Sequence, residues 1–293
     1  MMFVRVAALL AGLVALQLPA FRTAARLVVL HVTVRGAHGE PVTQLDRGAF
    51  TVYENGKPQP VTLFRRDDIP VSIGLLIDNS GSMRSRRLTV EAAALGFARA
   101  SNPDDELFVL NFADKARLDV PFTRDRGALE AGIARLDGIG GTAMRDAIQA
   151  GEAYLARAAH DRKALLVVTD GEDNSSVATL DAVVKRAEQD GTTIYAIGLL
   201  KDAHAAAARR ARDELDRLTR RTGGVAYYPA TLDAVEPIAL EIARRIRQQY
   251  TLAYAPMNQT LDGSYRAIRV AVAHRDRLTV LTRAGYYAAP IPE

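Results

Sequence analysis

The chain has 293 residues, of which 48% are hydrophobic and 25% are charged, and its formal net charge is +4. This length and apolar content are enough to bury a sizeable core, so disorder as the main state is excluded. The absence of cysteine excludes disulfides, thiolate catalysis and zinc held by sulfur, and the scattered arginines and lack of tryptophan argue against a nucleic-acid-binding surface.

Residues 1–20 have the order of a secretory signal, with Arg5 followed by a mostly apolar run. The run is short for a helix that spans a membrane. We therefore expect an exported protein that is periplasmic, attached to the cell surface or secreted. The alternative is an uncleaved N-terminal anchor, which would be its only contact with a membrane.

Residues 24–66 alternate in the two-residue period of β-strands, as in "RLVVLHVTVRG", and Asn55-Gly56 is a strong hairpin signal. The same texture returns in residues 249–290, in "YTLAYAP", "GSYRAIRVAVA" and "RLTVLTRAGYY". Neither segment has enough strands to be stable alone. We expect them to pair into one small β-sandwich-like domain, with the middle of the chain inserted between them.

Residues 70–248 alternate between strand and helix patterns. Apolar strands such as "VSIGLLID" and "ALLVVTD" are followed by helical patterns such as "RLTVEAAALGFARA" and "LDAVVKRAEQ". Strands that alternate with helices form a mainly parallel sheet that is covered on both faces. The predicted fold class is α/β, a doubly wound, mainly parallel sheet, together with the smaller all-β domain.

Three loops, two at predicted strand ends and one before a helix, carry oxygen ligands: "DNSGS", "GGTAMRD" and "TDGED". In such a sheet, ligands bind beyond the carboxyl ends of the strands. The candidate metal ligands are Asp78, Ser80, Ser82, Thr142 and Asp170. Carboxylates and hydroxyls are hard ligands, so we expect a divalent cation, Mg²⁺ before Mn²⁺ or Ca²⁺.

Hydroxyl ligands neutralise little of the charge of such an ion. We expect one coordination position to stay open to solvent and to favour an Asp or Glu carboxylate of a partner protein. The attraction strengthens where water is excluded.

With these motifs in this order, the segment from Val71 to Gln248 resembles a von Willebrand factor type A domain. The "DNSGS" loop, the Thr142 loop and "TDG" resemble the metal-ion-dependent adhesion site of that family, with all five positions intact. The β flanks further resemble a bacterial group of related proteins frequent in acidobacteria. The resemblance implies metal-dependent binding of another macromolecule, usually without catalysis, and it does not identify the partner.

Two other functions stay open. Asp78 at a strand end also suits the nucleophile of a phosphohydrolase of the haloacid dehalogenase type, although Ser80 stands where that mechanism needs a second carboxylate. An interaction domain that binds no metal is the other alternative. We predict a binding module and not an enzyme.

Several charged residues near the motifs have two interpretations each. Arg84, Arg86 and Arg87 are either a basic rim for an acidic ligand or, as we favour, a solvated face. Asp173 and Asn174 either support the site or reflect ordinary loop polarity. Asp146 either bonds within the Thr142 loop or simply lies in the first turn of its helix.

Overall fold

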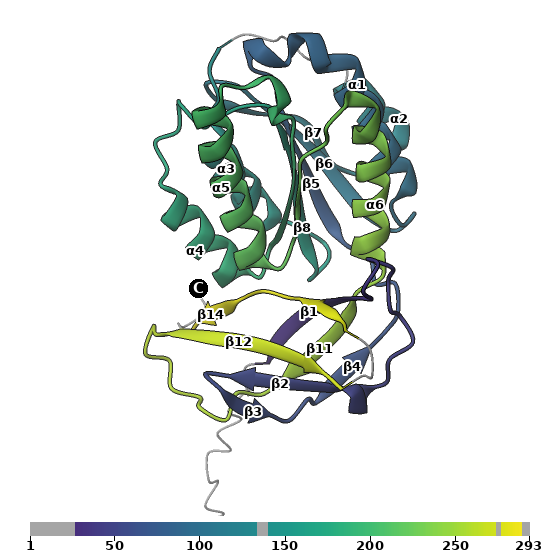
Figure 1. The fold of residues 1–293 in the computed structure, drawn as a ribbon, viewed down its shortest axis with the longest axis vertical. Helices are drawn as coiled ribbons and strands as arrows, with labels where there is room; N and C mark the ends of the chain where they lie inside the picture. Colours follow the sequence, from purple (N-terminus) through teal and green to yellow (C-terminus); the bar gives the residue numbers. More distant parts are fainter. Residues whose placement is uncertain (1–26, 134–139, 274–276, 289–293) are drawn as a thin grey trace, which may run out of the picture.

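The structure is a computed structural model that describes residues 27–133, 140–273 and 277–288. The export signal predicted in residues 1–20 lies outside these ranges. Two parts are stacked along the long axis of the molecule, a helix-covered α/β part and a β part beneath it (Figure 1).

The α/β part is built on a six-stranded sheet in the order β10-β9-β8-β5-β6-β7. Its strands are β5 (Ser72–Asp78), β6 (Glu106–Phe112), β7 (Ala116–Thr123), β8 (Lys163–Thr169), β9 (Thr193–Gly198) and β10 (Ala226–Tyr227). Strand β7 pairs with β6 in the antiparallel sense, and the other neighbouring pairs are parallel. The predicted mainly parallel sheet is confirmed.

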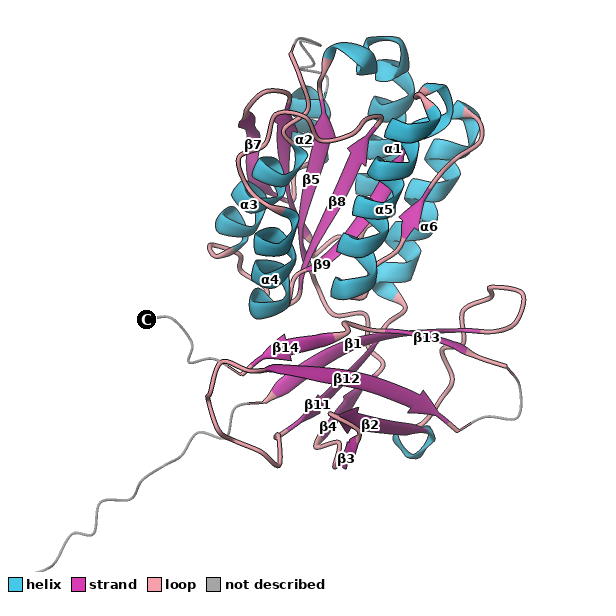
Figure 2. Ribbon diagram, turned by 60° about the vertical axis from the view of Figure 1, so that its left-hand side comes forward, coloured by secondary structure: helices cyan, strands magenta, loops and turns pink. Residues whose placement is uncertain are grey.

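Helices cover both faces of this sheet (Figure 2). The α-helices are α1 (Arg87–Ala100), α2 (Arg126–Ile133), α3 (Met144–Leu155), α4 (Leu180–Asp190), α5 (Ala205–Thr222) and α6 (Val235–Arg247), and the short 3-10 helices are η1 (Arg47–Ala49), η2 (Gly81–Arg86), η3 (Leu200–Asp202) and η4 (Leu232–Ala234). Leu75 of β5 packs in a core with α1, α2 and α6, and its neighbour Leu76 packs on the other face with α3, α4 and α5. Within the described residues, no helix has the length and apolar character needed to cross a bilayer.

The β part consists of two four-stranded sheets, in the orders β13-β1-β11-β4 and β14-β12-β2-β3. Its strands are β1 (Val28–Arg35), β2 (Phe50–Glu54), β3 (Lys57–Gln59), β4 (Leu63–Arg65), β11 (Tyr250–Tyr254), β12 (Tyr265–Val272), β13 (Thr279–Leu281) and β14 (Gly285–Tyr287). Strand β1 pairs with β11 and β2 pairs with β12, and the two sheets share one apolar core. The N-terminal and C-terminal strands therefore pair as predicted.

Two local features stabilise this sandwich. Asn55 and Gly56 have φ values of 48° and 80°, the left-handed conformation that the predicted hairpin between β2 and β3 requires. The buried Glu54 carboxylate accepts hydrogen bonds from the Tyr254 and Tyr286 hydroxyls at 2.8 and 2.9 Å. Its other oxygen lies 3.3 Å from the buried guanidinium of Arg266, so one polar cluster connects both sheets.

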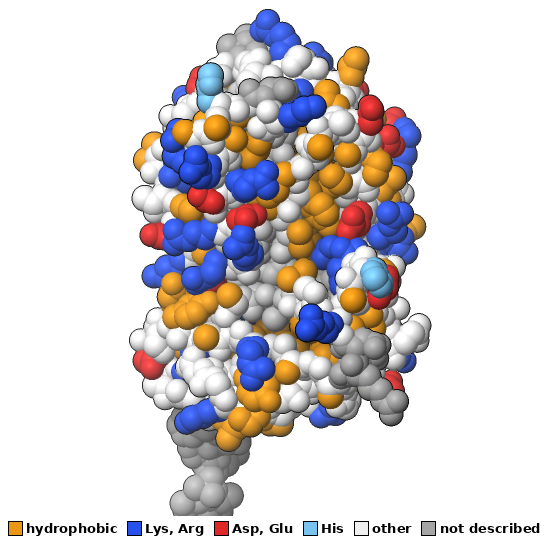
Figure 3. Space-filling model, in the orientation of Figure 1, with side chains coloured by type: hydrophobic (Ala, Val, Ile, Leu, Met, Phe, Trp, Pro, Cys, Tyr) orange, Lys and Arg blue, Asp and Glu red, His pale blue; other side chains and the backbone are white. Residues whose placement is uncertain are grey.

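Lys and Arg side chains are prominent on the face of the molecule in Figure 3, with acidic side chains between them. Many arginines of α5 are paired: Arg220 with Asp216 in the same helix, and Arg217 and Arg221 with acids of α4. The basic run of α5 is therefore balanced partly by an acid of its own helix and partly by acids of α4.

Candidate metal site

The predicted ligands lie at the carboxyl edge of the central sheet. Asp78 is the last residue of β5, Asp170 directly follows β8, and these two strands are parallel neighbours. Thr142 lies just before α3, which packs against both strands. Three segments that are distant in the sequence therefore meet where the sequence predicts.

A chain of hydrogen bonds joins four of the five residues. The backbone amide of Ser80 donates to Asp78 Oδ1 over 2.9 Å. The hydroxyl oxygens of Ser80 and Ser82 lie 3.1 Å apart, and Ser82 Oγ donates to Asp170 Oδ1 over 2.7 Å. The second oxygen of Asp78 accepts a hydrogen bond of 2.6 Å from the hydroxyl of Thr169. The two carboxylates are thus bridged by the serine loop.

The fifth residue, Thr142, is positioned by its backbone. Its amide donates to Asn174 Oδ1 over 2.9 Å, and its carbonyl accepts the amide of Asn174 over 3.0 Å. The carbonyl of Gly140 accepts the amide of Gly81 over 3.4 Å, which connects this loop to the serine loop. A Cβ built on Gly171 would lie 3.8 Å from Thr142 Oγ1, so this hydroxyl lies beside the loop that follows β8.

Two residues that support the site, Asp114 and Thr169, are not among the five predicted ligands. Asp114 Oδ1 accepts the amide of Gly141 over 2.7 Å. Gly140 has a φ of +100°, and a Cβ there would lie 2.4 Å from Asp114 Oδ2, so glycine is required for this approach. A single exposed aspartate after a strand carries no spacing signal, whereas the position of Thr169 at the end of β8 could have indicated its role.

Asp173 and Asp146 brace the start of α3. Asp173 accepts the backbone amide of Arg145 over 2.8 Å and forms an ion pair with its guanidinium at 3.0 Å. Burial alone would raise the pKa of Asp173, but these bonds outweigh it and lower the pKa. Asp146 lies in the first turn of α3, as one of its two interpretations predicts, and it accepts the amides of Val177 and Ala178 over 3.0 and 2.8 Å, so it reaches across to the loop after β8.

Arg86 lies against the site. Its guanidinium forms an ion pair with Asp170 Oδ2 and a hydrogen bond of 3.3 Å with the carbonyl of Ser82. Its side chain is only 12% exposed. The interpretation of this arginine as part of a solvated face is therefore wrong, because it is held by one of the predicted ligands.

The oxygen atoms of the site suit a cation. Asp78 and Asp170 are 1% and 5% exposed. Burial raises the pKa of Asp78 to about 6, against the opposing effect of its hydrogen bonds with Thr169 and Ser80. Two buried carboxylates with hydroxyls between them are a donor set that a hard divalent ion fits. No three His, Cys, Asp or Glu side chains of the described residues gather as a possible metal site, and this includes the candidate site, which would depend on hydroxyl ligands beside its two carboxylates.

Comparison with known proteins shows which sequences and folds this chain is similar to. Residues 73–172, which include all five predicted ligands, match the family model of the von Willebrand factor type A domain. Over these residues the chain is similar to a von Willebrand factor type A domain. An uncharacterized protein of Synechocystis, sll0103, is 34% identical over 109 residues, which are 36% of this chain and 26% of that protein. The chain thus matches about a quarter of the length of this relative.

Solved structures share the fold. One of them is a von Willebrand factor type A protein from Catenulispora acidiphila. The alignment covers 92% of this chain and 75% of that chain, with a TM-score of 0.54 and 14% identity. Proximal thread matrix protein 1 from the mussel byssus was solved with a zinc-occupied MIDAS motif. Its alignment covers 66% of this chain and 50% of that chain, with a TM-score of 0.55 and 16% identity. The vWF domain of the type V pili tip protein Mfa5 from Porphyromonas gingivalis also aligns with this chain. The alignment covers 61% of this chain and 97% of that chain, with a TM-score of 0.50 and 15% identity.

Proposed function

We propose that the type A domain is a protein-binding module that depends on a divalent cation. Asp78, Ser80, Ser82, Thr142 and Asp170 would hold the ion, which we propose is Mg²⁺, with Mn²⁺ or Ca²⁺ as alternatives. The observation that carries the proposal is the hydrogen-bonded path between the two buried carboxylates at neighbouring strand ends.

The residues of the chain would position the ion and its ligand. Thr169 and the Ser80 amide hold the Asp78 carboxylate in one orientation, so little ordering remains when a cation binds. Ser82 lies at the exposed rim of the site, whereas Ser80 and Thr142 are buried. When bound, the ion would offer an open coordination position to an Asp or Glu side chain of a partner protein.

The solved neighbours support this proposal at the level of the fold. One of them holds zinc in its MIDAS motif, and others are a pilus tip protein and a minor pilin of Streptococcus sanguinis. Together with the apolar run in residues 1–20, they support a role outside the cytoplasm, in adhesion or assembly at the cell surface, in the periplasm or after secretion.

A phosphohydrolase that uses Asp78 is the less supported alternative. Ser80 stands where that mechanism needs a second carboxylate, and the Asp78 side chain is 1% exposed, so it is poorly placed to attack a bulky phosphate ester. Assay of the purified protein with generic phosphomonoesters and Mg²⁺ distinguishes the two functions. No turnover is expected, and turnover that is lost in Asp78→Asn would contradict the binding proposal.

The binding function can be tested by capture of partners from the envelope fraction of the native cells on the immobilised protein. Capture is expected with Mg²⁺, and it should be lost with EDTA, restored by added Mg²⁺ and lost in Asp78→Ala. Asp213→Ala, on the exposed side of α5, is the matched control and should capture normally. Capture that EDTA leaves unchanged would show a metal-independent interaction domain instead.

The pairing of Arg86 with Asp170 leads to a prediction about metal affinity. The guanidinium competes with an incoming cation for the same carboxylate and repels it. Arg86→Gln is therefore expected to bind Mg²⁺ about tenfold more tightly, which is a gain of about 1.4 kcal/mol. Isothermal titration calorimetry measures the affinity, with Arg87→Gln at the start of α1 as the control. Equal or weaker binding in Arg86→Gln would show that this arginine supports the metal site.

A further inference from the structure

A pocket of about 320 Å³ lies where the end of α6 meets strand β1 of the sandwich (Figure 1). This volume is at the small end of the range for small-molecule sites. The polar residues that line the pocket are Thr33 and Arg35 of β1, Glu241, Arg244 and Arg245 of α6, and Gln248, which caps that helix. Both parts of the molecule therefore build this pocket.

Two regular patterns bring these side chains together. Val32 and Val34 face the core of the sandwich, so Thr33 and Arg35 project from the other face of β1, toward α6. The four residues from α6 and its cap are spaced at i, i+3, i+4 and i+7, so they share one side of the helix.

Glu241 is the one acid among the described residues that line the pocket. Its Oε1 accepts hydrogen bonds from Arg35 over 2.8 Å, from Tyr227 over 2.9 Å and from Arg245 over 3.2 Å. Burial alone would raise the pKa of Glu241, but these three bonds outweigh it and lower the pKa. A single ionised carboxylate is thus shared by two arginines.

Arg244 adds a third positive charge that no described residue balances. Its guanidinium is exposed and makes no hydrogen bond, ion pair or ring contact with any residue that the structure describes. Glu40, which precedes the lining residue Pro41, instead accepts the backbone amide of His38 over 3.1 Å. The pocket therefore combines three arginines with one glutamate, and two positive charges remain without a counter-charge.

Arg245 makes this excess of charge costly, because its side chain is buried. The residue is 6% exposed, and its Nε and Nη1 have no hydrogen-bond partner among the described residues. These two atoms are closed to solvent, so Arg245 acts on the pocket through its charge and not through them. The carboxylate that balances this charge is shared with Arg35, and an anion in the pocket would lower the remaining cost.

Neutral donors complete the pocket. The hydroxyl of Thr33 accepts a hydrogen bond of 3.0 Å from Gln249, so its own hydrogen is left to donate. The exposed side-chain amide of Gln248 carries two further N–H donors. Guanidinium groups bind phosphate oxygens in pairs, and a phosphate monoester carries a charge of about −1.5 to −2 at pH 7, which matches the two unbalanced positive charges.

From this charge balance and donor set, we propose that the pocket between β1 and α6 binds a phosphate group, either inorganic phosphate or a phosphate monoester. Arg244 and Arg35 would hold its oxygens, and Arg245 would stabilise its charge from within the protein. The pocket adjoins the sandwich, whereas the metal site is at the far edge of the central sheet, so the two sites are separate.

Isothermal titration calorimetry of the full-length protein with inorganic phosphate tests the site, with EDTA present so that no metal ion binds the phosphate. Saturable binding with one site per chain is expected. Arg244→Gln should weaken it by about tenfold, because a hydrogen bond to a charged group is lost. Arg209→Gln, an exposed position on α5, is the control and should bind normally. No saturable binding, or equal affinity in Arg244→Gln, would overturn the proposal.

Glu241→Gln distinguishes an anion site from a purely structural cluster. The variant removes the negative charge of the pocket but keeps an oxygen that can accept the three hydrogen bonds of Glu241 Oε1. Phosphate should then bind about threefold more tightly or better, because repulsion by the carboxylate is gone. Melting curves confirm that the variant folds, and unchanged or weaker binding in the folded variant would contradict the proposal.

Two phosphate esters identify the source of the phosphate group. Binding of both inorganic phosphate and glycerol 3-phosphate would support a monoester site, and binding of inorganic phosphate alone would support a site for the free ion. Dimethyl phosphate, which carries one charge, should bind much more weakly than inorganic phosphate. Equal affinity for both would refute the match of charge.

Asp78→Ala should leave phosphate binding unchanged, because Asp78 is at the opposite end of the central sheet. Loss of phosphate binding in this variant would place the phosphate at the metal site. That result would overturn the pocket between β1 and α6 and leave the metal-dependent function standing.

Discussion

Addition of Mg²⁺ to the metal-free protein is expected to raise its melting temperature, and Asp78→Ala is expected to remove this shift. At about 100 times its dissociation constant, a ligand stabilises the folded state by about 2.7 kcal/mol. For a chain of 293 residues, that corresponds to roughly 4 °C. The physical reason is that Asp78 is buried and hydrogen-bonded beside the serine loop, so its loss removes a charged ligand that water cannot replace. Differential scanning calorimetry with and without Mg²⁺ measures the shift.

The shift, and not the absolute melting temperature, is the quantity to compare, because Asp78→Ala also leaves the hydroxyl of Thr169 without its acceptor. Thr142→Ala removes a predicted ligand without removing charge and should reduce the shift. Asp213→Ala should retain the full shift. An equal shift in Asp78→Ala and the wild type would mean that the ion binds elsewhere.

Glu152→Gln is expected to gain stability over the wild type as the pH rises. Glu152 of α3 is 2% exposed, and neither carboxylate oxygen has a hydrogen-bond partner among the described residues. Burial, reinforced by the charge of Asp190, raises the pKa of Glu152 to about 9 from 4.5. The side chain is therefore protonated in the folded protein at neutral pH.

The sign of the effect follows from proton linkage. Between pH 4.5 and about 9, the folded protein keeps a proton on Glu152 that the unfolded chain releases, so stability falls as the pH rises through this window. Each pKa unit corresponds to about 1.4 kcal/mol at most. The glutamine variant does not lose stability in this way. The difference in free energy of unfolding between Glu152→Gln and the wild type should therefore grow by about 2 kcal/mol or more between pH 5 and pH 8.

Urea unfolding at several pH values measures the free energy of unfolding of both proteins. Other titrating groups are common to both, so the difference between the two profiles isolates Glu152. Glu91→Gln, at a half-buried position of α1, is the matched control and should follow the wild-type profile. Parallel profiles for Glu152→Gln and the wild type would contradict the prediction.

Sequence patterns predicted the elements whose signal is local. Strand β5 was predicted from its unbroken apolar run, and helix α1 was predicted from its helical period. The turn at Asn55-Gly56 was predicted from these two residues alone, because both adopt the left-handed conformation. Strand β7 was missed because its segment, "ARLDVPFT", is polar and contains a proline. Both features suit an edge strand, which β7 is, and its register with β6 shifts between Val109 and its neighbours.

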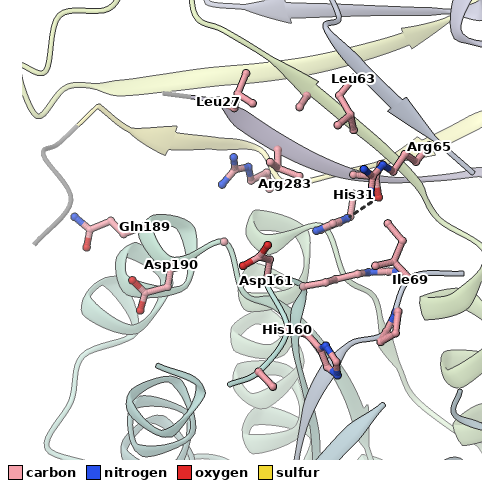
Figure 4. A pocket seen from close by; sticks show the side chains of 17 residues that line it. Leu27, His31, Leu63, Arg65, Ile69, His160, Asp161, Gln189, Asp190 and Arg283 are labelled. Carbon is pink, nitrogen blue, oxygen red and sulfur yellow. Dashed lines mark hydrogen bonds between the residues drawn. The ribbon is translucent and has the colours of Figure 1, made fainter. Parts of the chain in front are cut away.

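The sequence predicted those parts of the candidate site in which side chains with oxygen ligands directly follow a strand or precede a helix. The ligand loops were found because each follows a strand or precedes a helix in a parallel fold. The ion pair of Arg86 with Asp170 joins residues that are 84 positions apart and depends on side-chain conformations that no periodicity encodes. A cavity of about 590 Å³ that is lined by β1, β4 and the loop before β8 (Figure 4) likewise depends on the relative placement of these elements, which only the folded chain provides.

The connections between the two parts have a mechanical consequence. The chain enters the α/β part just before β5 and leaves it after α6, so both links to the sandwich are at the amino edge of the sheet, whereas the proposed metal site is at the other end of β5. A tensile force between a ligand at that site and the sandwich would run along β5. The hydrogen bonds of β5 to β6 and β8 would then be loaded together in shear, a geometry that resists rupture better than bonds that open one at a time.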